Sequence, residues 1–112
     1  MIASVKVGAH VYAVVVGNGE EPAEIDFHAG IIRITDRAPP THQAELLIHE
    51  ITHALVDNAG YNPWWRTKEG AEDDEDDAEE MLVRAIAPRL AAFMADNPAA
   101  VRELLVMLGC EE

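Results

Sequence analysis

Apolar and polar positions divide the chain into a strand-rich first third and a helical remainder. Before residue 36, short runs rich in Val and Ile occupy residues 4–7, 11–16, 24–28 and 31–35, with glycines and polar residues between them. Such residues favour pleated strands, in which alternate side chains share one face. We therefore predict a small antiparallel sheet at the N-terminal end of the chain.

The next apolar run predicts a helix from about Thr41 to Asp57. Pro39 and Pro40 precede it, and Thr41 is a suitable N-cap because its hydroxyl can accept a hydrogen bond from an amide one turn on. Gly60 follows as an exit from the helix. Apolar residues lie on nearly every side, which is typical of a helix packed into the centre of a domain.

Two more helices are predicted after this central helix. An amphipathic pattern runs from about Asp77 to Ala95, with Pro88 as its weak point. Asn97 followed by proline is typical of an N-cap and first helical position, so the last helix spans about residues 98–108. Strands followed by helices indicate an α+β fold, with the sheet packed on the central helix and two C-terminal helices behind it. A chain of 112 residues is long enough for a single domain, 1–112.

The central helix carries an H-E-x-x-H motif, His49 to His53. Residues four apart on an α-helix lie about 40° apart around the axis and about 6 Å along it, so both imidazoles can reach one metal ion. Glu50 is rotated by about 100° from His49, which places its carboxylate beside the ion and not on it. That is the position of a general base in a zinc (Zn²⁺) metallopeptidase. The opposing interpretation is a helix whose two histidines are hydrogen-bonded residues of the core or of its boundary.

A catalytic zinc site needs a third protein ligand. A metzincin-type continuation requires glycine at position 56 and histidine at position 59, where this chain has Val56 and Ala59. The remaining source is a carboxylate from a later helix, and Glu79 and Glu80 open the next apolar helix. We favour Glu79, because it lies in phase with the apolar stripe of that helix, and Glu80 stays open as the alternative.

Charge and composition limit the classes of molecule that the protein is expected to bind. The net charge is −13, and nine of the 21 acidic residues lie between Glu69 and Glu80, with no Lys or Arg among them. This charge disfavours nucleic acid and anionic membranes. The single cysteine, Cys110, excludes an internal disulfide. Neither a signal peptide nor a membrane-spanning run is evident, so we expect a cytoplasmic protein.

The stretch from Leu46 to Leu55, with Glu79-Glu80 at the head of a later helix, resembles the small metallopeptidases of phages and prophages, which are minimal gluzincins. The strand at 31–35 is similar to the strand at the edge of their cleft, and the resemblance covers the chain from that strand onward. It implies a zinc-dependent peptidase that acts on a peptide or protein, with Glu50 as the general base. Larger gluzincins also supply a Tyr or His that stabilises the oxyanion.

Several roles stay open at the level of sequence. Tyr61, His28 and His42 are candidates for the oxyanion-stabilising residue, and the aromatic segment 61–66 either covers the core or lines a substrate cleft. Two other functions compete with hydrolysis. One is a non-catalytic, zinc-stabilised module that binds a protein partner. The other is an acidic inhibitor or regulator whose run at 72–77 occupies a basic surface.

Overall fold

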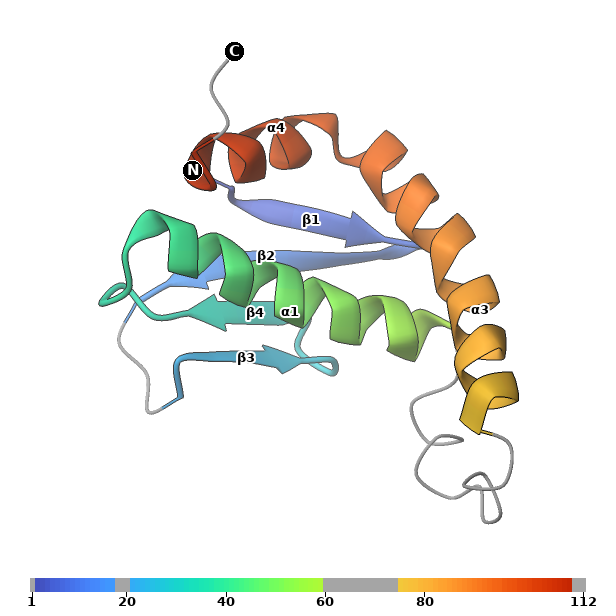
Figure 1. Ribbon diagram of the computed structural model, residues 1–112. Coiled ribbons are helices and arrows are strands. Elements are labelled where there is room, and N and C mark those ends of the chain that lie inside the picture. Colours follow the sequence, from blue (N-terminus) through green and yellow to red (C-terminus); the bar gives the residue numbers. More distant parts are fainter. Residues whose placement is uncertain (1, 18–20, 60–74, 110–112) are drawn as a thin grey trace.

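Four strands form one sheet, and the sheet is mixed. The computed structural model describes residues 2–17, 21–59 and 75–109, with the backbone alone over 75–81. The strands β1 (Ser4–Val7), β2 (His10–Val16), β3 (Ala23–Asp26) and β4 (Ile31–Ile34) lie in the order β1-β2-β4-β3 (Figure 1). The β1–β2 and β3–β4 pairs are antiparallel, whereas β2 and β4 are parallel. The α+β class is confirmed, but the prediction of an antiparallel sheet was wrong at its central pair.

Composition explains why β4, and not β3, lies inside the sheet. Ile32 and Ile34 of β4 are 0% and 2% exposed, whereas β3 turns Glu24 and Asp26 to solvent. Charged residues are suited to an edge strand, whose outer side has no strand partner. Since β3 runs opposite to β2 and turns tightly into β4, β4 runs in the same direction as β2.

The helix α1 (Pro40–Asn58) lies across one face of this sheet (Figure 1). Its core residues face those of the strands, and the helix α3 (Glu75–Asp96) and the helix α4 (Pro98–Met107) close the side next to β1. The buried apolar residues are Ile2, Val5, Val7, Tyr12, Ile32, Ile34, Ala44, Leu47, Ile51, Ala54, Leu55, Phe93, Ala100 and Leu104. All three predicted helices are therefore present, each within two residues of its expected bounds.

The start of α1 differs from the prediction. Pro39 is the N-cap and Pro40 is the first helical residue, where proline is well tolerated because its missing N–H would have no helical acceptor. Thr41 does not cap the helix. Its hydroxyl donates instead to the carbonyl oxygen of Met107, at 3.4 Å, which links the first turn of α1 to the end of α4.

The C-terminal end of α1 is joined to both α3 and the β1–β2 turn. Arg89 Nε donates to Asn58 Oδ1 at 3.0 Å, one residue after Pro88, and α3 runs through Pro88 without ending. The Asn58 side chain also packs against Gly8, which has φ +62°. A Cβ at Gly8 would lie 2.5 Å from Asn58 Nδ2, so the turn needs glycine both for its conformation and for this contact.

Asn97 joins the helical layer to the free edge of β1. It is the N-cap residue of α4, as predicted, but its side chain makes no capping hydrogen bond. The amide instead pairs with the backbone of Lys6 as a neighbouring strand would: Oδ1 accepts from Lys6 N and Nδ2 donates to Lys6 O, both at 2.8 Å. Nδ2 also donates to Phe93 O at 2.8 Å. One side chain thus forms hydrogen bonds with backbone groups of an edge strand and of the end of α3.

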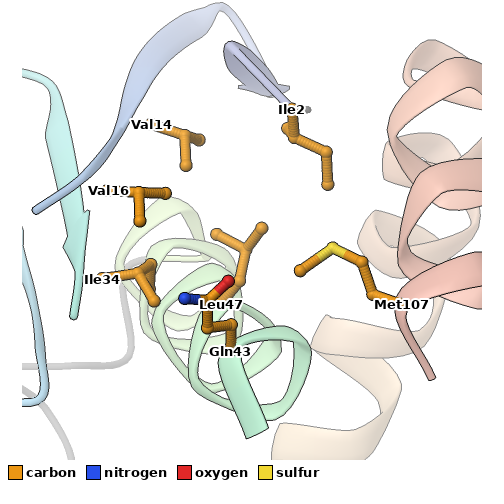
Figure 2. A pocket seen from close by; sticks show the side chains of 7 residues that line it. All are labelled: Ile2, Val14, Val16, Ile34, Gln43, Leu47 and Met107. Atoms are coloured by element: carbon orange, nitrogen blue, oxygen red, sulfur yellow. The ribbon is translucent and has the colours of Figure 1, made fainter. Parts of the chain in front are cut away.

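A small hollow remains where the sheet, α1 and α4 meet. Figure 2 shows side chains from all three layers around it. The lining residues are Ile2, Val14, Val16, Ile34, Gln43, Leu47 and Met107. Its volume is about 20 Å³, enough for a single water molecule. This space is therefore a packing defect of the core and not a ligand site. Within the described residues, no helix is long and apolar enough to cross a bilayer.

Replacing Asn97 tests its role at the sheet edge. Asn97→Ala removes three hydrogen bonds to backbone groups that are partly open to water, and we expect it to lower the free energy of unfolding by about 1–2 kcal/mol. Denaturant unfolding measures this loss. Asn97→Ser keeps a good N-cap residue but cannot span to Lys6, so it should lose about as much. Full stability in the serine variant would mean that capping, and not the contact with β1, is the role of Asn97.

Tyr12 provides a test by pH. Burial raises the pKa of its phenol above the usual 10.0, and the negative charge of Asp57 raises it further. The unfolded chain therefore releases this proton at lower pH than the folded one, so the stabilisation is complete below pH 10 and is lost as pH rises above it. Unfolding measured from pH 8 to 11 should show a smaller alkaline loss for Tyr12→Phe than for the wild type. Parallel curves would contradict this assignment.

Candidate metal and catalytic site

The structure brings the two motif histidines together on α1. His49 Nε2 and His53 Nε2 lie 3.1 Å apart, and the two rings meet edge to face with centroids 4.7 Å apart. Two nitrogens that each bind a tetrahedral zinc ion at 2.0–2.1 Å are about 3.3 Å apart. The same separation suits an N–H···N hydrogen bond between neutral rings. The donor set and its spacing therefore fit two corners of a zinc site.

These histidines are exposed, contrary to the expectation of a helix enclosed on nearly every side. Both His49 and His53 lie on the open side of α1, and Ile48 beside them is 40% exposed. The expectation failed because the sheet covers only one side of α1. Because both imidazoles are open to water, they do not need a metal ion to satisfy their polar atoms. The observation that still favours a metal is the short distance between their Nε2 atoms.

Glu50 is the buried member of the motif. It is 6% exposed and is the only charged residue in the core of the described chain. No described residue donates a hydrogen bond to its carboxylate. Among the described residues, every side-chain oxygen or nitrogen that is fully enclosed has a hydrogen-bond partner, so the Glu50 oxygens are not fully enclosed. The Glu50 carboxylate therefore keeps a narrow opening to solvent. A carboxylate beside a pair of convergent imidazoles, with limited access for water, is suited to move protons.

The opening leads into a pocket between α1 and β3. It has a volume of about 340 Å³. Its lining residues are Pro22, Ala23, Glu45, Leu46, His49 and Glu50. The strand at its edge is β3, whereas β4, expected at the cleft edge from the resemblance, is paired on both sides inside the sheet. That expectation was wrong because β4 is more apolar than β3 and is therefore buried inside the sheet.

The third ligand stays a prediction. Glu79 and Glu80 lie in the first turns of α3, about 15 Å along the helix from Arg89, which joins α3 to the end of α1. Their side chains lie outside the described residues, and no group of three metal-binding side chains forms within the part that is described. The stripe that favoured Glu79 over Glu80 is also less buried than expected, since Val83 is 52% exposed.

Of the candidates for an oxyanion-stabilising residue, the two that are described, His28 and His42, make no hydrogen bond or ring contact with the histidine pair. His28 is exposed in the turn between β3 and β4. His42 is exposed, and its Nδ1 contacts Glu45 Oε1, three residues later, at 3.3 Å. It lies about 10 Å along α1 from His49. Tyr61 lies outside the described residues, as do the rest of the aromatic segment 61–66, the acidic residues 69–74 and Cys110.

Sequence reasoning missed a second hollow, an apolar groove of about 220 Å³ between α1, α3 and α4. Its lining residues are Ile48, Ile51, Thr52, Leu55, Leu90, Phe93, Met94, Val101, Leu104, Leu105 and Leu108. Leu90 and Met94 belong to the apolar stripe of α3, yet they are 42% and 48% exposed. Periodicity finds such a stripe without showing whether another element covers it.

Comparisons of the chain with models of protein families, with curated proteins and with solved structures give no match. The site therefore has to be interpreted from its own residues.

The histidine pair can be tested by metal content. His49→Ala and His53→Ala should each lose the one zinc ion expected per chain, because two remaining protein ligands make a weak site. The exposed His28→Ala and His42→Ala are matched controls that should keep it. Elemental analysis after dialysis provides the measurement. Full zinc in either motif variant would contradict the site, and Glu79→Ala compared with Glu80→Ala identifies the third ligand.

Proposed function

We propose that this protein is a zinc-dependent peptidase. The observation that carries the proposal is the arrangement on α1: two Nε2 atoms 3.1 Å apart, and between them in sequence a buried glutamate that opens into the adjacent pocket. A zinc site that is purely structural gains nothing from a carboxylate at that position. A hydrolase needs one, because water must lose a proton as it attacks a carbonyl.

The roles of the residues follow from their positions. His49 and His53 hold the ion through Nε2, with Glu79 or Glu80 as the proposed third ligand. A bound zinc ion polarises the scissile carbonyl and makes water more acidic. Glu50 accepts a proton from the attacking water at a carboxylate oxygen and returns it to the leaving amine. Its burial limits competing water, and the pocket beside it receives the substrate.

A peptide or a segment of a protein is the substrate that suits this site. The pocket lies between α1 and β3, whose outer side has no strand partner among the described residues. An extended peptide can pair with such an edge through its backbone. Nucleic acid and anionic membranes are disfavoured by the net charge of −13. A cytoplasmic location and membership of the small phage-type minimal gluzincins belong to this proposal as well.

A zinc-stabilised module that binds a protein without cleaving it is the second candidate. The apolar groove between α1, α3 and α4 favours it, since exposed apolar surface of this kind marks interaction sites. On α1 the groove uses Ile48, Thr52 and Leu55, which form a stripe apart from His49, Glu50 and His53. Such a module keeps the metal ligands but has no use for Glu50. An acidic regulator is a third function, but its proposed run at 72–77 has no described side chains to support it.

Glu50→Gln separates the peptidase from the binding module. Glutamine keeps the size of the side chain but is not basic, so zinc content and melting temperature should stay near those of the wild type. Hydrolysis should fall by about 10²–10⁴-fold, the usual contribution of general acid–base catalysis. The assay follows cleavage of unfolded protein substrates, with and without a chelator.

The wild-type activity must be sensitive to the chelator and must vanish in His49→Ala. A Glu50→Gln variant that cleaves as fast as the wild type would exclude Glu50 as the base. A wild type that holds zinc and cleaves none of a broad set of unfolded substrates would favour the binding module.

A further inference from the structure

We propose that the pocket beside Glu50 holds a basic side chain of the substrate, and that Glu45 selects it. This inference rests on the proposed function, because it assigns a side-chain preference to the same cleft. It adds a substrate class, peptides with Lys or Arg next to the scissile bond, and a residue that determines specificity without taking part in the chemistry.

The lining of the pocket combines an apolar wall with negative charge. Pro22, Ala23 and Leu46 provide the apolar part, while Glu45 and Glu50 provide two carboxylates. No Lys or Arg is among the described residues that line it. Lysine and arginine match this pattern, because their long stems pack on apolar surface and their charged ends reach outward. The volume of about 340 Å³ is large enough for such a side chain.

Glu50 adds a second negative charge to the pocket. It is 6% exposed, lines the pocket, and receives no hydrogen bond from any described residue, while its carboxylate keeps an opening to solvent. Both carboxylates repel an acidic substrate side chain and attract a basic one. A basic side chain that pairs with Glu45 leaves Glu50 free to act as the proposed base.

Glu45 is the carboxylate best placed to make the selection. Its side chain is 64% exposed, and it lies one helical turn before His49 on α1. One oxygen, Oε1, contacts His42 Nδ1 at 3.3 Å, which leaves Oε2 without a hydrogen bond from the described residues. Because Glu45 is neither a proposed metal ligand nor the proposed base, its replacement leaves the proposed ligands and the base in place.

Acidic residues on the neighbouring strand are already engaged. Glu24 of β3 forms an ion pair with Arg33 at 3.7 Å. Asp26 Oδ1 accepts a hydrogen bond from Ala29 N at 2.9 Å, within the turn to β4. Among the described residues that line the pocket, the negative charge is that of Glu45 and Glu50.

The test measures binding directly, so that it does not depend on turnover. Fluorescently labelled, unstructured peptides differ at one central position, which holds Arg, Lys, norleucine or Glu. Their binding to the full-length, zinc-loaded protein is followed by anisotropy in the cold, and mass spectrometry verifies that they stay intact. We expect the Arg and Lys peptides to bind about two- to fivefold more tightly than the norleucine peptide, the range for a pair at a partly exposed site. Glu45→Gln should remove most of this preference, and so should high salt.

Asp96→Asn is the matched control. It removes one negative charge from an exposed residue that precedes Asn97, and Asn97 contacts β1 at the opposite edge of the sheet. The preference for a basic peptide should survive in this variant. Equal losses in Glu45→Gln and Asp96→Asn would show a general effect of net charge and overturn the proposal, as would equal binding of the Arg and norleucine peptides or no measurable binding of the Arg peptide.

Cleavage of the same peptides separates this inference from the proposed function. If the protein binds basic peptides through Glu45 but cleaves none of them, the pocket stands and the peptidase proposal fails. If it cleaves peptides through Glu50 without regard to the central residue, the peptidase stands and the pocket proposal fails.

Discussion

The rotation of α1 about its own axis, which decides the side chains that face the sheet, is the constraint on which the site depends. Ala44, Leu47, Ile51, Ala54 and Leu55 face the core and are at most 4% exposed. Each large apolar side chain buried in this way contributes about 1.5–3 kcal/mol relative to exposure. The two alanines let the helix lie close to the strands. A rotation of one residue would turn histidine into the core and expose leucine, so the apolar stripe determines where every polar side chain of the motif points.

The environment of Glu50 results from this rotation of α1. It lies three residues after Leu47 and four before Ala54, at the margin of the buried stripe and next to β3. His49 and His53 fall outside that margin, where their Nε2 atoms converge in the open. One helix therefore provides a shielded carboxylate and an accessible pair of imidazoles. The sheet order completes the arrangement, because it places the charged β3 with its small Ala23, and not the apolar β4, beside the pocket.

A few hydrogen bonds and buried apolar side chains attach the C-terminal helices to the rest of the described fold. Thr41, Asn58 and Asn97 each make a hydrogen bond that joins α3 or α4 to α1 or β1. Apolar contact is concentrated at Phe93, Ala100 and Leu104, and between these anchors the groove stays open. Among the described residues, the hydrogen bond from Arg89 to Asn58 is a polar contact between α3 and α1. This joint also sets where the first turns of α3, with Glu79 and Glu80, lie relative to the histidine pair.

The amino-acid sequence by itself determined the elements, the α+β class and the candidate chemistry on α1. Strands and helices follow from local periodicity, proline and glycine, and the i, i+4 spacing of His49 and His53 makes their convergence a property of any helix. Only the tertiary structure decided the parallel pairing of β2 with β4, because strand order depends on which strand gains most from burial. It also decided that the histidines are exposed, that the side chain of Asn97 pairs with Lys6 and makes no capping hydrogen bond, and that the groove is left uncovered. Each of these depends on which surfaces meet across long separations in the chain, and periodicity within one segment carries no information about its partner.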